Sequence, residues 1–480
     1  MKKIGTFAPR SSKQIRASKI GVGFECVERK MWDDTEELYR AAGELGVKHA
    51  RVMTGWFRCE REKGVYDFEW LEKIVDKLLA QGIRPWFCVC YGNKLYCDSP
   101  ADDAAGYPPL FSEEARTAWT RYATELATRF RGRVTHFEVW NEPNCSGFWK
   151  KGPDYGEYVD LVRITSTAIR ACNPEAKIIG GASGMSISWW IGHHDIYEYI
   201  KRGICPLIDA FTFHRYHILP ELNRPEDFRM LRAMFDENGG KHVELWQGES
   251  GCTSKSAETE AFANLPVNEE IQVKVALRSI MTDLKNGLDY TCYFTMSDYK
   301  YYYRNGLLPK PHFFGLVTFD DPPRRKPVYH GIQTLANLFD EDTVPCDTIK
   351  CQLDLLPFPP EQRFTFQEKL IQMQLATFRR KGYPLVAWWM PADLIPEIAG
   401  NPPYQPFNAL FRIWTPGLNI RTPVLIDPIS QEVFEPERFD DPWLKKRKCD
   451  LPPADLSAIP VRDYPLILTD REAVADMLGE

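Results

Sequence analysis

The feature that most constrains the fold of this chain is the alternation of short apolar runs with longer amphipathic stretches, as far as about residue 340. Eight runs are apolar on both faces, which is typical of strands in a parallel sheet that helices cover. They are Ile20–Val27, His49–Gly55, Pro85–Tyr91, Thr135–Trp140, Lys177–Gly181, Ile208–Tyr216, Val243–Gly248 and Tyr290–Met296. Eight such strand–helix units predict an α/β fold, a (β/α)8 TIM barrel.

The stretches between these runs repeat their apolar residues with the period of an α-helix. The helical patterns are Thr35–Leu45, Phe68–Ala80, Ser112–Phe130, Tyr155–Cys172, Glu226–Asn238 and Ile271–Asn286. An open doubly wound sheet is the alternative to a barrel. It is disfavoured because no GxGxxG turn follows the first run, where Gly21-Val22-Gly23 lies inside the strand itself.

The sequence changes character near residue 345, where prolines become dense and helical periodicity gives way to short β-like runs. These runs predict a smaller C-terminal antiparallel β-sandwich. Its expected strands are Leu385–Trp389, Ala409–Trp414, Pro423–Ile426, Glu432–Phe434 and Pro465–Leu468. We therefore predict two domains, a (β/α)8 barrel over residues 1–342 and a β-sandwich over residues 343–480.

Charge and cysteine usage exclude several classes of partner. The 480-residue chain has a net charge of −6 and a pI near 6.0, which disfavours a general electrostatic grip on nucleic acid. No window approaches about 18 uninterrupted apolar residues, so no membrane span is predicted. The 13 cysteines are scattered without a CxxC pair, and the N-terminal segment lacks the apolar core of a signal peptide. We therefore expect a cytoplasmic protein, or a secreted one whose signal has been removed.

Two carboxylates follow barrel strands that face each other. Glu142 comes just after the fourth run, within Asn141-Glu142-Pro143, and Glu249 comes just after the seventh. Chemistry in such barrels gathers at the carboxyl ends of the strands, and strands four and seven lie across the mouth from each other. Two facing carboxylates are the minimal equipment for breaking a glycosidic bond. The alternative is that each is a surface glutamate where its strand emerges.

Other residues of the runs fit the same predicted site. Arg51 lies inside the second run, and a cation buried in an apolar barrel needs an anionic partner. Glu249 is the natural partner, and this pairing would keep it ionised, as a nucleophile needs. Strand alternation places His214 and Tyr216 on one face of the sixth run. It sends His217 to the other face, so the two histidines diverge and no metal site is predicted.

The eighth run and the aromatic residues beyond the strands complete the prediction. Asp298 follows the eighth run by two residues and is expected at the same mouth. Trp149 belongs to a group of aromatic residues just past the strands, and apolar sugar faces stack on such rings, although barrels also use them structurally. The predicted partner is therefore an oligosaccharide or glycoside, with no cofactor; the sequence makes no prediction of the oligomeric state.

At these residues the chain resembles a clan A retaining glycoside hydrolase, and most of all glycoside hydrolase family 39. The resemblance covers nearly the whole barrel in the order of the family, and Asn-Glu-Pro at the end of a fourth strand is its most specific motif. The matching segments are Phe137–Asn144 with Phe148-Trp149, Ile179–Gly181, Asp209–Tyr216, Glu249, Phe294–Asp298, Phe313–Leu316 and Lys326–Tyr329. The β-sandwich resembles the accessory domain of the same group.

The resemblance implies a role for each matching site residue. Glu142 would be the general acid/base and Glu249 the nucleophile of a double displacement with retention. Asn141 would hydrogen-bond the 2-hydroxyl of the sugar being cleaved, while His214 and Tyr216 would line the subsite around the nucleophile. β-Xylosides are the first expected substrates, with uronic-acid glycosides and endo-acting glycan cleavage as alternatives.

One departure from the family and two rival functions stay open. Gly248-Glu249-Ser250-Gly251 is glycine-flanked where the family usually has a simple Thr-Glu or similar, so Glu244, at the start of the strand, is the fallback nucleophile. The first rival is a barrel that binds carbohydrate without catalysis. The second is a metal-assisted enzyme, which would need histidine and carboxylate ligands from several strand ends. The first strand offers Glu25 but no histidine.

Overall fold

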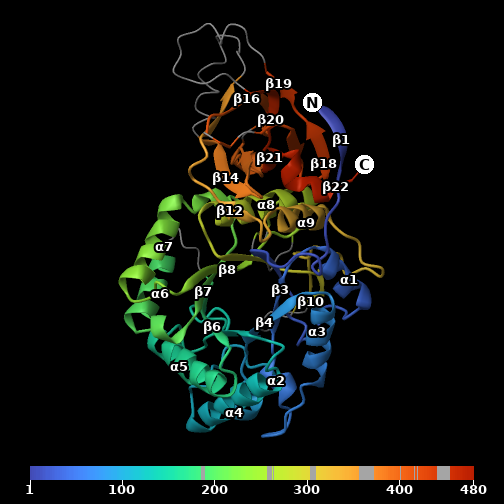
Figure 1. Ribbon diagram of the computed structural model, residues 1–480. Coiled ribbons are helices and arrows are strands. Elements are labelled where there is room, and N and C mark those ends of the chain that lie inside the picture. Colours follow the sequence, from blue (N-terminus) through green and yellow to red (C-terminus); the bar gives the residue numbers. More distant parts are fainter. Residues whose placement is uncertain are drawn as a thin grey trace.

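Figure 1 shows the computed structural model of the chain, with a barrel below and a β domain above it. The structure describes residues 1–184, 190–256, 262, 264–302, 310–355, 372–400, 402–415, 417–418, 420–439 and 455–479. Within these ranges no helix is long and apolar enough to cross a membrane, and the twelve cysteines are all free thiols.

The eight predicted barrel strands are all present and close into one parallel barrel in chain order. They are β2 (Ile20–Gly23), β3 (His49–Met53), β4 (Arg84–Val89), β5 (His136–Val139), β6 (Lys177–Ser183), β7 (Ala210–Arg215), β8 (Glu244–Ser250) and β9 (Tyr290–Tyr293). The TIM-barrel prediction is therefore confirmed, and the carboxyl ends of all eight strands open at one mouth.

Helices surround the barrel, and six of them match the predicted patterns to within a few residues. They are α1 (Glu36–Glu44), α3 (Glu69–Ala80), α4 (Glu113–Arg129), α5 (Tyr155–Cys172), α7 (Pro225–Glu237) and α8 (Glu269–Lys285). Side-chain oxygens of Thr35, Ser112, Asp154 and Asn268 each accept an N–H of the following first turn, which fixes where four of these helices begin. Among the described residues, the helices that were not predicted include the short α2 (Trp56–Cys59), α6 (Trp190–Lys201) and α9 (Pro327–Leu338).

Large side chains fill the barrel below its mouth. The inner core residues are Trp86, Ile179, Ala210, Trp246, Tyr290 and Cys292. The Tyr290 phenol reaches Gly21, where an added Cβ would lie only 1.5 Å from its oxygen. The polar groups at the mouth therefore lie directly above a packed apolar core, which excludes water from that side.

Two antiparallel sheets form the C-terminal β domain, in agreement with the predicted fold class. The larger has the order β12-β14-β15-β21-β17-β18-β1-β22 and the smaller the order β13-β16-β20-β19. Their strands are β1 (Lys2–Phe7), β12 (Thr343–Pro345), β13 (Cys351–Leu355), β14 (Gln374–Arg380), β15 (Tyr383–Trp389), β16 (Phe407–Ile413), β17 (Pro423–Ile426), β18 (Glu432–Glu435), β19 (Glu437–Arg438), β20 (Leu456–Val461), β21 (Leu466–Asp470) and β22 (Leu478–Gly479). Trp388 packs with Phe411 between the sheets, while its neighbour Trp389 joins the core shared with the barrel.

The first strand of the chain belongs to this β domain and not to the barrel. β1 pairs antiparallel with both β18 and β22. In Figure 1 the blue N-terminal arrow accordingly lies beside the red C-terminal strands. The predicted boundary at residue 342 assigned residues 2–7 to the barrel domain, whereas these residues form a strand of the β domain. Their isolated position, twelve residues before the first barrel strand, gave no sequence signal of this long-range pairing.

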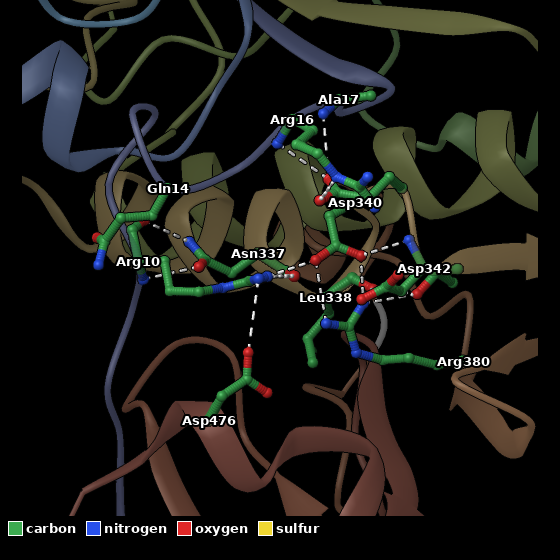
Figure 2. Close-up of polar contacts among 12 residues, drawn as sticks. Arg10, Gln14, Arg16, Ala17, Asn337, Leu338, Asp340, Asp342, Arg380 and Asp476 are labelled. Carbon is green, nitrogen blue, oxygen red and sulfur yellow. Dashed lines mark hydrogen bonds and ion pairs between the residues drawn. The ribbon is translucent and has the colours of Figure 1, made fainter.

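Asp340 joins the barrel to the β domain just after α9 (Figure 2). Arg10, between β1 and β2, and Arg380, at the end of β14, both point at its carboxylate. Arg380 donates from Nη2 at 3.0 Å, and the backbone N–H of Asp342 donates at 2.9 Å. Asp340 and Arg380 are both fully buried, so this carboxylate neutralises a guanidinium that water does not reach, and it also pairs with the partly exposed Arg10.

Replacing Asp340 with alanine is expected to lower the free energy of unfolding by about 3–5 kcal/mol, because the buried Arg380 loses its counter-ion. The matched control is Asp342→Ala. The Asp342 carboxylate is one-third exposed and 4.0 Å from Lys381, so its loss should cost at most about 1 kcal/mol. Urea denaturation of both variants compares them, and equal losses would contradict this account of the joint.

Candidate active site

A sharp turn directly after β5 places Glu142. The backbones of Trp140 and Glu142 lie in the left-handed region, with φ of 67° and 47°. The Glu142 N–H donates to the carbonyl of Ala182, near the end of β6, at 2.9 Å. The turn ends the strand and leaves the Glu142 side chain half-buried at the mouth of the barrel.

A β-bulge in β8 aims Glu249 into the barrel. The pairing of β7 with β8 skips Gly248, so that His214 pairs with Glu249. Trp246 faces the barrel interior, so regular alternation would turn Glu249 outward. The extra residue of the bulge reverses that direction.

The two glycines beside Glu249 are explained by packing. A Cβ on Gly248 would lie 3.3 Å from the His214 ring, and one on Gly251 would lie 2.5 Å from the carbonyl oxygen of Phe294. The glycine-flanked sequence thus lets β8 lie close to both neighbouring strands. Glu244, the fallback nucleophile, opens β8 at the opposite end of the strand.

Four predicted residues meet at one point of the mouth. A carboxylate oxygen of Glu142, one of Glu249 and a ring nitrogen of His214 all lie within 4.8 Å of one another. His214 Nδ1 is 2.9 Å from Glu142 Oε1 and 3.6 Å from Glu249 Oε2. The Tyr216 hydroxyl donates to Glu249 Oε2 at 2.8 Å. His214 therefore bridges the two carboxylates that the sequence placed across the mouth.

Arg51, in β3, holds this group from below. Its side chain is fully buried, and its Nη1 donates to the Glu249 carboxylate. This is the ion pair that the sequence predicted. Its Nη2 donates to Asn141 Oδ1 at 2.8 Å. Asn141 Nδ2 in turn donates to the Tyr91 hydroxyl at 2.9 Å. One guanidinium thus orients both Glu249 and Asn141.

The charges around Glu249 keep it ionised although it is buried. Burial raises the pKa of Glu249, but His214, Arg51 and the Tyr216 hydroxyl outweigh it, so the pKa lies below the usual 4.5. Burial lowers the pKa of His214, but the two carboxylates outweigh it and raise the pKa above 6.5. An ionised Glu249 therefore lies beside a histidine that keeps its proton at mildly acidic pH.

Two buried glutamates at the site were not among the predicted site residues. Glu138, inside β5, accepts from Arg51 Nε and from the Thr212 hydroxyl, both at 2.6 Å. Glu25, two residues past β2, lies 3.2 Å from Arg51 Nη1. Each falls within an apolar run, where a charged side chain needs a partner. The same signal identified Arg51 and could have identified them.

The structure does not bring Trp149 and Asp298 to the carboxylate pair. Trp149 is fully buried, and its Nε1 donates to Glu157 at 3.1 Å. Asp298 is buried and accepts from Lys326 Nζ at 2.7 Å. The described contacts of both side chains are with the surrounding core. The expectation that functional residues follow the strand ends did not distinguish Trp149 and Asp298 from residues that lie at the mouth.

Glu142, His214 and Glu249 would each offer one ligand atom to a metal ion. Metal ligands must be deprotonated, however, and here the pKa of His214 is raised. The guanidinium of Arg51 also places a positive charge against Glu249. The arrangement therefore favours proton transfer and nucleophilic attack over metal binding.

Comparisons with known proteins agree with the resemblance seen in the sequence. The family model "Glycosyl hydrolases family 39" matches residues 8–356. A curated β-xylosidase of Geobacillus stearothermophilus is 27% identical, and the match spans 58% of this chain and only 58% of that relative. A solved family 39 glycoside hydrolase from Bacteroides cellulosilyticus WH2 is similar with a TM-score of 0.63 and 18% identity, covering 94% of this chain and 80% of the other. A monomeric β-xylosidase from Caulobacter crescentus CB15 has a TM-score of 0.57 and 18% identity, covering 97% of both chains.

Proposed function

The chain belongs to glycosyl hydrolase family 39, and on that premise we propose that it cleaves O-glycosidic bonds by double displacement with retention. The proposed general acid/base is Glu142 and the proposed nucleophile is Glu249. The observation that carries the proposal is the short distance between these two residues. A carboxylate oxygen of Glu142 lies within 4.8 Å of one of Glu249. Retaining enzymes hold their carboxyl groups about 5–5.5 Å apart, whereas inverting enzymes need about 6.5–9.5 Å to admit a water.

The proposed reaction has two steps. Glu249 attacks the anomeric carbon while Glu142 gives its proton to the glycosidic oxygen, so the bond to the leaving group breaks and a glycosyl ester forms on Glu249. A water then attacks the same carbon, Glu142 takes its proton, and the ester bond breaks. Two displacements at one carbon restore its original configuration.

β-Xylosides are the first proposed substrates, since the Geobacillus stearothermophilus and Caulobacter crescentus CB15 relatives are β-xylosidases. Asn141 is proposed to bind the 2-hydroxyl, and its side chain is held on both sides by Arg51 and Tyr91. Glycosides of uronic acids and endo-acting cleavage remain the alternatives to test. A barrel that only binds carbohydrate is disfavoured, because the charges around Glu249 are those of an ionised nucleophile.

The proposal is tested with a panel of aryl β-glycosides and oligosaccharides. We expect turnover of a β-xyloside that EDTA leaves unchanged. Proton NMR of the cleaved substrate should show the β-anomer as the first product, before mutarotation. The α-anomer as first product would contradict the mechanism, and loss of turnover with EDTA would favour the metal-assisted alternative.

We expect a bell-shaped dependence of kcat/KM on pH. The acid limb should lie below pH 4.5, because protonation of Glu249 removes the nucleophile and its pKa is lowered. The alkaline limb should lie above pH 6.5, because the proton of His214, whose Nδ1 contacts Glu142, is lost there and the pKa of His214 is raised. Initial rates at subsaturating substrate measure this profile. A flat profile between about pH 4 and 9 would contradict the assignment.

Gly184, directly after β6, is expected to be required for the position of Glu142. A Cβ on Gly184 would lie 2.9 Å from Glu142 Cδ and 2.7 Å from Cys145 Sγ. Gly184→Ala should therefore displace the carboxyl group and lower kcat/KM by about 10²-fold. Gly147→Ala is the matched control, because its added Cβ meets nothing within 4 Å. Equal rates for the two variants would show that Glu142 tolerates the displacement.

A further inference from the structure

Glu25 is a third glutamate at the nucleophile for which the proposed reaction has no role. It follows β2, and its carboxyl group folds back over Gly23, where an added Cβ would lie 1.8 Å from Glu25 Oε2. Its side chain is fully buried. It touches two groups of the barrel mouth, the guanidinium of Arg51 and the hydroxyl of Thr295.

Glu25 takes the last free N–H of Arg51. The guanidinium has five N–H groups, and Nε and Nη2 use three of them on Glu138, Asn141 and the Cys88 sulfur. Nη1 has the other two, one for Glu249 and one for Glu25 Oε1 at 3.2 Å. With every N–H engaged, the guanidinium has one orientation, and that orientation presents Nη1 to Glu249.

The contact with Thr295 is compatible with a Glu25 that carries a proton. The Thr295 hydroxyl has one hydrogen, and it lies 2.8 Å from the Gly23 carbonyl, which can only accept. The same hydroxyl lies 3.3 Å from Glu25 Oε2. With an ionised Glu25 the single Thr295 hydrogen has to be shared between two acceptors, whereas a protonated Glu25 can donate to Thr295 while Thr295 donates to Gly23. A neutral Glu25 therefore completes a chain from its own carboxyl through Thr295 to Gly23.

The surroundings favour the neutral form as well. Burial raises the pKa of Glu25 to about 8, with Glu249 adding to the rise and Arg51 opposing it. The other titratable groups that face it are thiols and phenols with pKa values raised well above normal, so they carry no charge. They are Cys26, Tyr216, Tyr290, Cys292 and Tyr299. The charges facing Glu25 are thus those of Arg51 and Glu249, and Arg51 already serves the carboxylates of Glu249 and Glu138.

We propose that Glu25 is a positioning residue that stays protonated at neutral pH and, by occupying the last N–H of Arg51, holds Glu249 and Asn141 in their reactive places. The inference rests on the proposed function for its kinetic part only. The neutral carboxyl accepts from Arg51 without competing with Glu249 for its positive charge. An ionised Glu25 at the same place would also accept from Arg51, but it would compete with Glu249 for the positive charge of the guanidinium.

The kinetic test compares Glu25→Gln with Glu25→Ala. Glutamine copies the protonated acid, because its amide oxygen accepts from Arg51 and its amide nitrogen donates to Thr295. We expect Glu25→Gln to keep kcat/KM within about threefold of wild type at pH 6, with an unchanged acid limb. Glu25→Ala should lose about 30-fold or more, and its acid limb should move to higher pH because Arg51 holds Glu249 less firmly. A loss beyond about 100-fold in Glu25→Gln would overturn the proposal, since it would mean that the charge of Glu25 is needed.

A second test needs no substrate, so it separates this inference from the proposed function. A pKa raised from 4.5 to about 8 means that folded wild type keeps a proton that the unfolded chain releases between these pH values. Its stability should therefore fall as pH rises through this window, and Glu25→Gln should escape that loss. We expect the Tm of Glu25→Gln relative to wild type to rise by several degrees between pH 5 and 8. A constant difference, equal to that of the partly exposed control Glu244→Gln, would overturn the proposal.

Discussion

Replacement of Glu249 with alanine is expected to lower kcat/KM for the cleaved glycoside by about 10⁴-fold or more, because the first displacement loses its nucleophile. External azide should then restore turnover. Azide enters the space that the carboxylate leaves and attacks the anomeric carbon once, so the glycosyl azide should have inverted configuration. Steady-state rates and proton NMR of the product measure both effects.

Glu244→Ala is the matched control on the same strand. Glu244 opens β8, and its carboxylate contacts Lys177 and the Trp246 indole, away from the mouth. Its removal should change kcat/KM by less than about threefold. If Glu244→Ala lost most of its kcat/KM while Glu249→Ala stayed active, Glu244 would be the nucleophile. That result would contradict the proposed site.

Replacement of Glu142 with alanine is expected to lower kcat/KM by about 10²–10⁴-fold for glycosides whose leaving group needs a proton. Aryl glycosides with acidic phenols leave without that proton, so their first step should suffer far less. The second step of these substrates still lacks the base that activates water, so the glycosyl ester accumulates. Both kcat and KM should therefore fall. Rates across leaving groups of graded acidity measure this dependence.

Azide also distinguishes the two glutamates. In Glu142→Ala it attacks the ester on Glu249, so the glycosyl azide should keep the configuration of the substrate. An inverted azide from this variant, or an equal loss for every leaving group, would contradict the acid/base role of Glu142.

The barrel could be predicted from the sequence because each parallel strand is buried on both faces, and a run such as His49–Met53 stays recognisable without knowledge of its neighbours. The helices were predicted for a similar local reason, because each repeats its apolar residues with the helical period. α9 was missed although Pro327 at its first turn is a recognised start signal, because it follows a long connection after β9. β1 could not be predicted, because its pairing with β18 joins opposite ends of the chain.

The site was only partly predictable from the sequence. Glu142 follows a strand end closely, so the barrel rule puts it at the mouth, where it contacts His214. The direction of Glu249 depends on the bulge at Gly248, which strand alternation does not reveal. Glu25 folds back onto Arg51 from beyond its strand, a contact that no sequence period encodes. Trp149 shows the converse, since an aromatic residue past a strand turned out to be buried.

The central claim is that Glu249 forms a covalent bond with the sugar. It is tested most directly with a 2-deoxy-2-fluoro glycoside of the cleaved sugar that carries a good leaving group. The fluorine slows both displacements and the leaving group restores the first, so the ester accumulates and intact-protein mass spectrometry can detect it. We predict one label per chain, located by peptide sequencing on Glu249. A label on Glu25, Glu138, Glu142 or Glu244 would contradict the account.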